Sequence, residues 1–165
     1  ISLGLVGSEM CIRDSNWDSA TAVGPGSQII NRKFIVLMTD GDNVWNSNSN
    51  PNGSIYSPFG YFRNSRLQTG TNSGNATTIM NTKTLEACTN IKALRDKDNN
   101  EAVKIFTIGY SVPGAAISAA GLQLLKDCAS TEGGQKLYYT ASNAAELNTV
   151  FANIAALLGK LSITR

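Results

Sequence analysis

Residues 33–43 read KFIVLMTDGDN, and this stretch decides the predicted fold. Residues 34–38 form a short apolar run that ends in a turn sequence, which is typical of a strand buried on both faces in a parallel sheet. Asp40 then stands at the carboxyl end of that strand, where open α/β sheets bind ligands. The alternative is a strand that ends in an ordinary Asp-Gly turn.

The same turn carries candidate metal ligands. Asp40, Asp42 and Asn43 offer carboxylate and amide oxygens, and Thr39 adds a hydroxyl. Hard oxygen ligands suit Mg²⁺ or Ca²⁺ better than zinc. A functional turn is therefore expected to hold a divalent cation.

Composition excludes several classes of protein. The 165 residues are enough for one domain, and 42% of them are hydrophobic. A net charge of +2 without a Lys/Arg cluster gives no indication of nucleic-acid binding. The chain has no His, the commonest general base and zinc ligand, and its three cysteines show no CxxC spacing.

The first residues look foreign to the rest of the chain. Residues 3–15, LGLVGSEMCIRDS, resemble translated sequencing-adapter read-through, so residues 1–15 are expected to be a non-native tract. The apolar run 3–6 is too short for a signal peptide and has no basic leader. Residues 16–33 contain Gly-Pro-Gly and predict a loop remnant before a domain spanning residues 34–165.

A long polar tract, residues 44–81, follows the Asp40 turn and predicts a loop. Connections of this length in compact domains are usually functional or disordered. This one carries five aromatic residues, Trp45, Tyr56, Phe59, Tyr61 and Phe62. Because it starts at the carboxyl edge of the strand, we expect a binding loop over that edge; a disordered insertion is the alternative.

Helical and strand patterns then alternate to the end of the chain. Helical periodicity covers residues 82–96 and 117–128, and β-branched or aromatic runs at 103–109 and 137–139 predict strands. Asn143 and Glu146 have a capping-box spacing that opens a last helix. That helix carries an apolar stripe, which we interpret as core packing: Leu147, Val150, Phe151, Ile154, Leu157, Leu158 and Leu161.

This alternation predicts an α/β fold, a partial doubly wound, Rossmann-like parallel sheet with right-handed crossovers. The three strands should be neighbours in sequence order, with residues 34–39 at one side. Three strands are few for such a sheet, and the first is apolar on both sides. We therefore expect this chain to lack the N-terminal strands of its sheet.

Several tracts together resemble the von Willebrand factor A domain, and more narrowly its version in the Tad (Flp) pilus-assembly proteins of the TadG-like group. They are residues 34–45, the helix with Cys88, the strand ending Ile108-Gly109-Tyr110, the Cys128-Ala129-Ser130 tract and the ending 161–165. The resemblance covers residues 33–165, the C-terminal half to two-thirds of such a domain.

The resemblance implies a metal-ion-dependent adhesion site (MIDAS) at the carboxyl edge of the sheet. In the family, an Asp-x-Ser-x-Ser motif, a Thr and the Asp of the TDG turn form that site; only the last is matched, by Asp40. The resemblance thus implies a non-enzymatic binding or adhesion module of a bacterial cell-envelope pilus-assembly protein. It would engage a protein partner through a site incomplete in this chain, with the membrane anchor in the missing N-terminal part.

Two other functions are weighed against this one. A Mg²⁺-dependent phosphoryl-transfer or hydrolase site on Asp40 and Asp42 needs a nucleophile or base held by a second group, and no such pairing is visible. A calcium-stabilised structural domain would use the Asn/Asp-rich loop, although the EF-hand pattern is absent.

The resemblance also bears on the cysteines. Cys88 and Cys128 fall on the apolar faces of helices that flank residues 103–109, and the family's envelope compartment is oxidising. A disulfide between them is expected, with two buried free thiols as the alternative.

Deleting residues 1–15 should leave the melting temperature unchanged, because a non-native tract has no reason to complement the core. Thermal unfolding of the full chain and of the deletion variant tests this expectation. A lower melting temperature after deletion, with residues 3–6 docked as a sheet strand, would contradict it.

Overall fold

The computed structural model describes residues 33–67, 72–95, 99, 101–111, 114 and 116–163. All of them belong to one unit, Lys33–Arg165. Three strands, β1 (Lys33–Thr39), β2 (Val103–Tyr110) and β5 (Tyr138–Ala141), form a parallel sheet in the order β1-β2-β5. The predicted order, direction and lateral position of the first strand are confirmed. The tract 1–15 and residues 16–32 of the predicted loop 16–33 lie outside the described residues. Lys33, the last residue of that predicted loop, is instead the first residue of β1, since it pairs with Val103.

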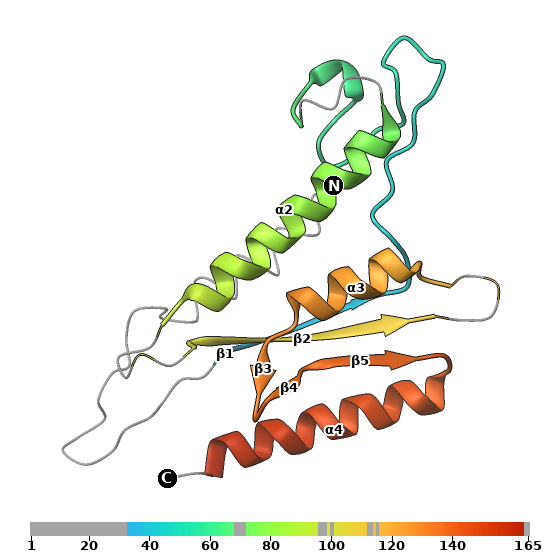
Figure 1. Cartoon of the computed structure of the whole chain (residues 1–165). Coiled ribbons are helices and arrows are strands. Elements are labelled where there is room, and N and C mark those ends of the chain that lie inside the picture. The colour runs from blue at the N-terminus through green and yellow to red at the C-terminus, as the bar shows by residue number, and fades with distance from the viewer. Residues whose placement is uncertain are drawn as a thin grey trace, which may run out of the picture. The chain divides into compact units, whose positions relative to one another are not determined.

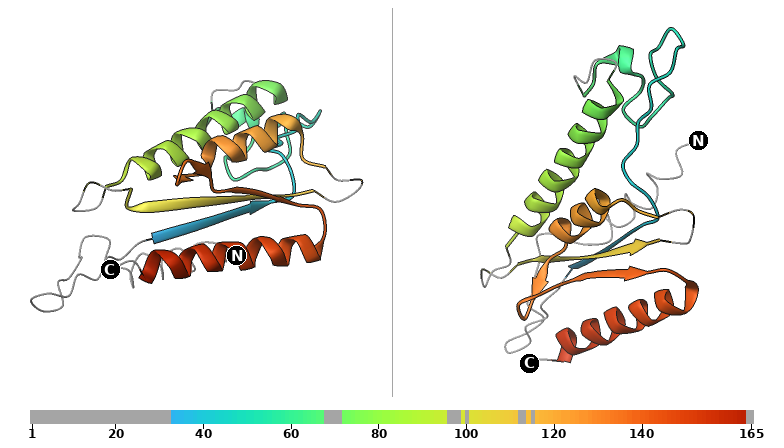
Figure 2. Two further views of the ribbon diagram at one scale, coloured as in Figure 1. Left: turned by 60° about the horizontal axis from the view of Figure 1, so that its bottom comes forward. Right: turned by 45° about the vertical axis from the view of Figure 1, so that its right-hand side comes forward.

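Helices cover both faces of this sheet (Figure 1). Helices α2 (Ser73–Ala93) and α3 (Ala119–Cys128) lie on one face, and α4 (Ala144–Ile163) lies on the other, as the left view of Figure 2 shows. This layering is compatible with a partial Rossmann-like fold. Within the described part of the chain, none of the helices is long and apolar enough to cross a bilayer.

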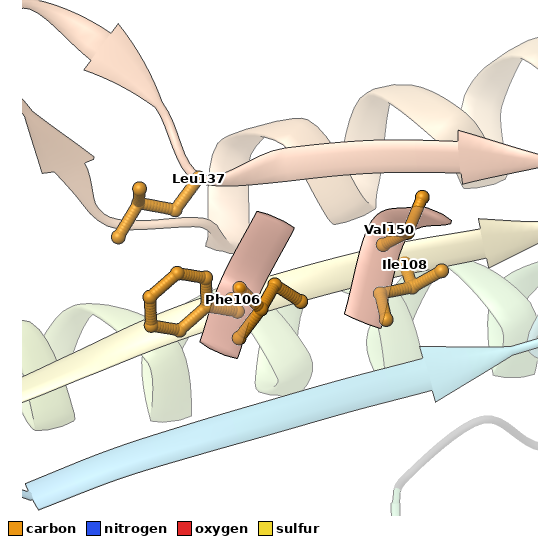
Figure 3. Packing of buried hydrophobic residues seen from close by; sticks show 5 residues of the cluster. Phe106, Ile108, Leu137 and Val150 are labelled. Atoms are coloured by element: carbon orange, nitrogen blue, oxygen red, sulfur yellow. The ribbon is translucent and has the colours of Figure 1, made fainter. Parts of the chain in front are cut away.

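Strand β2 is the strand that is buried on both faces. Its residues Ile105 to Ile108 are all at most 1% exposed. Phe106 and Ile108 point toward α4 and form a cluster with Leu137 and Val150 (Figure 3). On the opposite face, Ile105 packs with Cys88 and Cys128. The alternation of side chains along a strand thus links the two helical layers through β2.

The expected double burial of β1 is wrong. Four consecutive residues remain partly exposed: Ile35 36%, Val36 42%, Leu37 38% and Met38 49%. These residues are exposed because β1 is the outermost described strand: it pairs with β2 along one side, and no described strand pairs with its other side. An apolar run identifies a strand, but it does not tell an edge strand from a central one.

Helix α2 begins nine residues earlier than predicted, within the tract assigned to the loop. Asn72 caps it by accepting a hydrogen bond from the Asn75 backbone N–H at 3.0 Å. The first turns are rich in Ser, Asn, Thr and Gly, residues that favour turns and caps over helix interiors. Tertiary packing overrides that preference, because Ala76 is fully buried against the aromatic residues of the preceding segment. Helix α2 ends at Ala93, short of the predicted residue 96.

A small hairpin, β3 (Thr131–Glu132) and β4 (Gln135–Lys136), precedes β5 and was not predicted. Gly133 and Gly134 form its two-residue turn with φ of 56° and 80°, the conformation that a type I′ turn needs. Strand β5 consequently begins at Tyr138, one residue later than predicted. Ile117, expected on the second helix, precedes α3 but is buried.

The capping of α4 follows the predicted spacing. The Glu146 backbone N–H donates to Asn143 Oδ1 at 3.0 Å, while the Glu146 carboxylate accepts from the Ser142 backbone N–H at 2.7 Å. The hydrogen bonds that the Ser142 backbone N–H, the Ser142 hydroxyl and the Asn143 amide donate to this carboxylate lower the pKa of Glu146. Val150 and Ile154 of the stripe are buried as expected, whereas Phe151 is 43% exposed. The Leu161 side chain lies outside the described part.

The predicted disulfide is present. Cys88 of α2 and Cys128 of α3 are joined, with their Cα atoms 5.2 Å apart and a sequence separation of 40. The bond ties the two helices of one layer together beneath β2, where both cysteines contact Ile105.

Removing this disulfide should cost about 3–4 kcal/mol of unfolding free energy, the chain-entropy value for a loop of this length. Cys88→Ser/Cys128→Ser is compared with the parent chain by denaturant unfolding. Cys11→Ser is the matched control, since Cys11 is the remaining cysteine of the chain and is not part of the bond. A double variant as stable as the control would show that the bond constrains nothing in the unfolded chain.

Candidate functional site

The candidate site is the turn after β1, at the carboxyl edge of the sheet. Thr39 ends β1, and its hydroxyl donates to the Gly41 carbonyl at 3.0 Å and lies 3.3 Å from the Gly41 N–H. The hydroxyl therefore closes the turn onto itself. This local hydrogen bonding accounts for the sharp change of direction after the strand.

Asp40 stands at the tip of this turn and is exposed. Its carboxylate makes no hydrogen bond or ion pair with any residue that the structure describes. Nearly all the other polar side chains of the turn have partners. Asp40 is consequently the carboxylate of this edge that is open to a ligand or partner.

Asp42 is directed toward the N-terminus of α3. Its Oδ2 accepts a hydrogen bond from the Ser118 backbone N–H at 3.3 Å. Ser118 is itself the N-cap, and its hydroxyl accepts from the Gly121 N–H at 3.1 Å. A carboxylate near a helix N-terminus is stabilised by the unpaired N–H groups and by the helix dipole. Asp42 thus attaches the turn after β1 to α3, a contact across 76 residues of sequence.

Gly121 is required for this contact. A Cβ atom at this position would overlap the Asp42 carboxylate and would also lie within 2.7 Å of the Ile117 side chain. The absence of a side chain lets the turn approach the first turn of α3 closely. The sequence gives no indication of this role, because Gly inside a helix is otherwise only a weak helix former.

Asn43 makes the corresponding contact to α2. Its amide Nδ2 donates to Asn81 Oδ1 at 2.9 Å and lies 3.4 Å from Thr84 Oγ1. The Thr84 hydroxyl donates in turn to the Met80 carbonyl at 2.9 Å. The two residues after Gly41 therefore hold the two helices of one layer, Asp42 holding α3 and Asn43 holding α2.

A pocket of about 370 Å³ lies between these helices at the same edge. Its polar lining includes Asp42, Asn43 and three residues of α2, Thr77, Asn81 and Thr84, and its apolar lining includes Leu37 and Leu124. Sequence analysis missed the α2 residues. Thr77, Asn81 and Thr84 are spaced by four and three positions, which places them on one face of a helix. Sequence analysis could not use this spacing, because the predicted helix began only at residue 82.

The described side chains do not form a complete metal site. Across the described ranges, no group of three His, Cys, Asp or Glu residues is close enough together to hold an ion. Asp42 and Asn43 are engaged with α3 and α2, and Thr39 with its own turn. Mg²⁺ prefers near-octahedral oxygen coordination with one or two carboxylates. Asp40 has both carboxylate oxygens uncommitted, whereas α3 and α2 hold the side chains of Asp42 and Asn43 through Oδ2 and Nδ2, which leaves one oxygen of each without a hydrogen bond. With these side chains held in place and no third acidic group nearby among the described residues, the fit is poor.

The predicted binding loop is largely a small core. Trp45 and Phe62 are only 1% and 2% exposed, with their ring centroids 4.6 Å apart. Phe59 packs against them, and Trp45 Nε1 donates to the Ile55 carbonyl at 3.2 Å. The expectation of a binding surface is therefore wrong for Trp45 and Phe62, because the segment needs them to bury the first turns of α2.

Two aromatic residues of the same segment remain near solvent. Tyr56 is 71% exposed and meets Tyr61 edge to face, with ring centroids 5.2 Å apart. Val44 and Ile55 are also exposed, at 63% and 49%. The exposed apolar surface of this segment is thus made by Val44, Ile55 and Tyr56.

A cluster of charged residues lies near the start of β2, away from the turn. Lys104 forms ion pairs with Glu101 at 2.7 Å and with Glu132 at 2.9 Å. Burial disfavours the charged ammonium, but the hydrogen bonds to the two carboxylates outweigh it and raise the pKa of Lys104. Glu101 also accepts from the buried Ser130 hydroxyl at 2.7 Å. The cluster fastens the β3–β4 hairpin to β2, which is a structural role.

Comparison of the chain with protein-family models, with curated proteins and with solved structures found no match.

Asp42→Ala should lower the unfolding free energy by about 1 kcal/mol, because it leaves the N-terminus of α3 without its carboxylate acceptor. Asp40→Ala is the matched control two residues away and should change stability by no more than about 0.5 kcal/mol. Denaturant unfolding of both variants gives the comparison. Equal losses in both variants would contradict the assigned roles.

The role of Gly121 is tested by a double-mutant cycle. Gly121→Ala ordinarily stabilises a helix by about 1 kcal/mol, but here it should destabilise, because Cβ meets the Asp42 carboxylate. In the Asp42→Ala background the loss should be smaller, with the contact to Ile117 remaining. A coupling near zero would mean that Asp42 does not pack on Gly121.

Proposed function

We propose that this chain is part of a non-enzymatic protein-binding module, the C-terminal part of a von Willebrand A-type domain from a bacterial pilus-assembly protein of the Tad (TadG-like) group. In this proposal, the turn after β1 is the recognition edge, and a protein partner of the pilus or cell-envelope assembly contacts it. The membrane anchor belongs to the missing N-terminal part. The supporting features are a parallel sheet with helices on both faces and an acidic residue at its carboxyl edge.

The observation that carries the proposal is the difference between Asp40 and Asp42. Asp42 is engaged with the α3 N-terminus, whereas Asp40 is exposed without a described partner at the tip of the same turn. A binding edge needs an accessible group on a rigid support. The hydrogen bonds of Thr39, Asp42 and Asn43 provide that support.

A divalent cation, Mg²⁺ or Ca²⁺, takes a secondary place in this proposal. In the resembled family most direct contacts come from an Asp-x-Ser-x-Ser motif, which does not occur in this sequence. Asp40 alone supplies one carboxylate, whereas Mg²⁺ sites use one or two carboxylates with further oxygens and waters. The cation site is therefore proposed to be weak or absent in this chain.

The proposed compartment is the periplasmic or surface side of the cell envelope. The disulfide between Cys88 and Cys128 supports it, because disulfides persist in oxidising compartments and are rare in the cytosol.

The other two functions have less support. For a hydrolase or phosphoryl-transfer site, Asp42 would have to leave the α3 N-terminus, where it accepts a hydrogen bond from Ser118. For a calcium-stabilised loop, carboxylates are needed, and residues 44–67 contain none. Amide oxygens of that segment are already engaged: Asn48 and Asn50 accept from the backbone N–H groups of Asn50 and Asn52.

The chain should bind Mg²⁺ or Mn²⁺ with a dissociation constant of about 1 mM or weaker, at best about 4 kcal/mol. Isothermal titration of the full chain measures this, with Asp40→Ala expected to remove whatever binding is present. Asp127→Ala is the control, since Asp127 is an exposed carboxylate of α3. In the complete domain that the resemblance implies, binding should be appreciably tighter and should weaken on Asp40→Ala.

Two results would contradict this proposal. Micromolar cation binding by the chain itself would mean that Asp40, Asp42 and Asn43 form a complete site, which favours the calcium or enzymatic function. If the complete domain binds the cation equally well after Asp40→Ala, the interpretation of this edge as an adhesion site is wrong.

A further inference from the structure

The segment 44–67 carries positive charge without any acidic residue, and so do the first turns of α2 that pack against it. Residues 43–85 contain Arg63, Arg66 and Lys83 but no Asp or Glu, so all 12 acidic residues of the chain lie outside this range. The segment leaves the carboxyl end of β1 and extends past the N-terminal end of α2, away from the sheet, as Figure 1 and Figure 2 show. A positively charged projection thus belongs to a chain whose net charge is only +2.

The two arginines of this segment are exposed. Among the described residues, neither guanidinium makes a hydrogen bond or an ion pair. The Arg63 backbone N–H donates to the Asn52 carbonyl at 3.2 Å, and Leu67, which follows Arg66, is buried in the small core of the segment. The backbone is therefore held in place, while both charges are uncommitted and accessible to an anionic partner.

Exposed apolar side chains lie close to these charges along the chain. Ile55 is 49% exposed and Tyr56 is 71% exposed. Tyr56 meets Tyr61 edge to face, with ring centroids 5.2 Å apart, and Tyr61 stands two residues before Arg63. This ring contact joins the part of the segment that carries the apolar side chains to the part that carries the cations.

The turn between the two tyrosines is ordered. Ser57 and Gly60 exchange two backbone hydrogen bonds of 3.0 and 2.8 Å, and Gly60 has a φ of 88°, which favours glycine. Phe59, within this turn, packs against Trp45 of the small core. Because the backbone is already fixed, docking of the neighbouring exposed side chains costs little further conformational entropy.

Two kinds of anionic partner are weighed, an acidic protein and a lipid surface. An acidic protein has carboxylates at a few positions, so it disfavours Asp and Glu only opposite those positions. A layer of anionic phospholipid is charged over a whole plane and disfavours them throughout the segment that approaches it. Tyr is enriched at the membrane–water interface, and apolar side chains enter the headgroup boundary. The absence of Asp and Glu throughout residues 43–85 therefore favours the lipid surface.

We propose that the segment 44–67 is a docking surface for an anionic phospholipid layer. Ile55 and Tyr56 enter the headgroup region, and Arg63 and Arg66 approach the lipid phosphates. The expected N-terminal strands would pair with the outer side of β1, in the plane of the sheet, whereas this segment extends away from the sheet. Each cation near an anionic surface strengthens binding only about fivefold, so binding by this one segment is weak and reversible.

Co-sedimentation with vesicles tests the proposal. The full chain is mixed with vesicles of phosphatidylglycerol and phosphatidylcholine in equal parts, or of phosphatidylcholine alone, from about 0.1 mM to about 5 mM lipid. Binding to the anionic vesicles should be at least about tenfold tighter than binding to the neutral ones. Raising the NaCl concentration from about 0.1 M to about 1 M should remove most of that difference, because the Debye length falls from about 10 Å to about 3 Å.

Substitutions assign the binding to the segment. Arg63→Gln and Arg66→Gln should each weaken binding to the anionic vesicles about fivefold. Tyr56→Ser should weaken it at least about threefold, because less apolar area enters the headgroup region. The matched controls are Lys126→Gln, at an exposed cation of α3, and Phe151→Ser, at an exposed apolar residue of α4. Neither control should change binding by more than about twofold.

A fluorescent label locates the contact independently. In a Cys11→Ser background, an environment-sensitive fluorophore attached to Tyr56→Cys should shift its emission to the blue on anionic vesicles, whereas the same label on Phe151→Cys should not. Cys88 and Cys128 form the disulfide and do not react with the label. Far-UV circular dichroism and thermal unfolding check that each variant is folded, as expected because the substituted side chains are exposed.

The proposal is overturned if the full chain binds neither kind of vesicle or binds both equally. It is equally overturned if the control substitutions weaken binding as much as those in the segment, or if the label at position 151 shifts and the label at position 56 does not. Binding of poly-L-glutamate that depends on Arg63 and Arg66, without binding of vesicles, would identify an acidic protein as the occupant instead. None of these results depends on Asp40 or on divalent cations, so they leave the proposed function untouched.

Discussion

Double burial of β2 is the constraint on which the rest of this unit depends. Phe106 and Ile108 face α4, while Ile105 and Thr107 face the layer of α2 and α3, so one strand connects both sides of the sheet. The Thr107 hydroxyl is fully buried and donates to the Leu125 carbonyl at 2.9 Å, which avoids an unsatisfied polar group in this core. Gly109, at the carboxyl end of β2, lets α3 approach, since a Cβ there would lie 3.1–3.4 Å from three apolar side chains.

From this centre, the structure becomes less buried toward β1. Among the described strands, β1 pairs only with β2. Side chains attach the turn after β1 to the helices. Asp42 and Asn43 connect that turn to α3 and α2 over 76 and 38 residues of sequence. Side chains that resemble metal ligands in the sequence are thus used as tertiary connections, which is a common fate of polar groups after a strand. The exposed Asp40 is the exception, and it carries the proposed function for that reason.

The long polar segment shows how packing can replace intrinsic preference. Its Trp45 and Phe62 form a second core with Leu67 and Ala76, separate from the core around β2. That core stabilises the first turns of α2, a region whose Asn, Ser, Thr and Gly content favours a loop. The buried Ser54 hydroxyl accepts from the Phe62 N–H at 3.0 Å and donates to the Ile55 carbonyl at 2.9 Å, so the segment is an ordered structure with satisfied polar groups.

The sequence by itself determined the local elements and their order, since apolar runs and helical periodicity act within a few residues. From it followed the parallel strands β1, β2 and β5, the cap of α4 at Asn143 and Glu146, and, together with the family resemblance, the bond between Cys88 and Cys128. Tertiary structure decided which strand is central, where α2 begins, and which side chains of the turn are engaged. These features depend on contacts between residues far apart in sequence, such as Asp42 with Ser118 and Trp45 with Phe62. No pattern within a short window contains them, because a residue's own type does not specify what covers it.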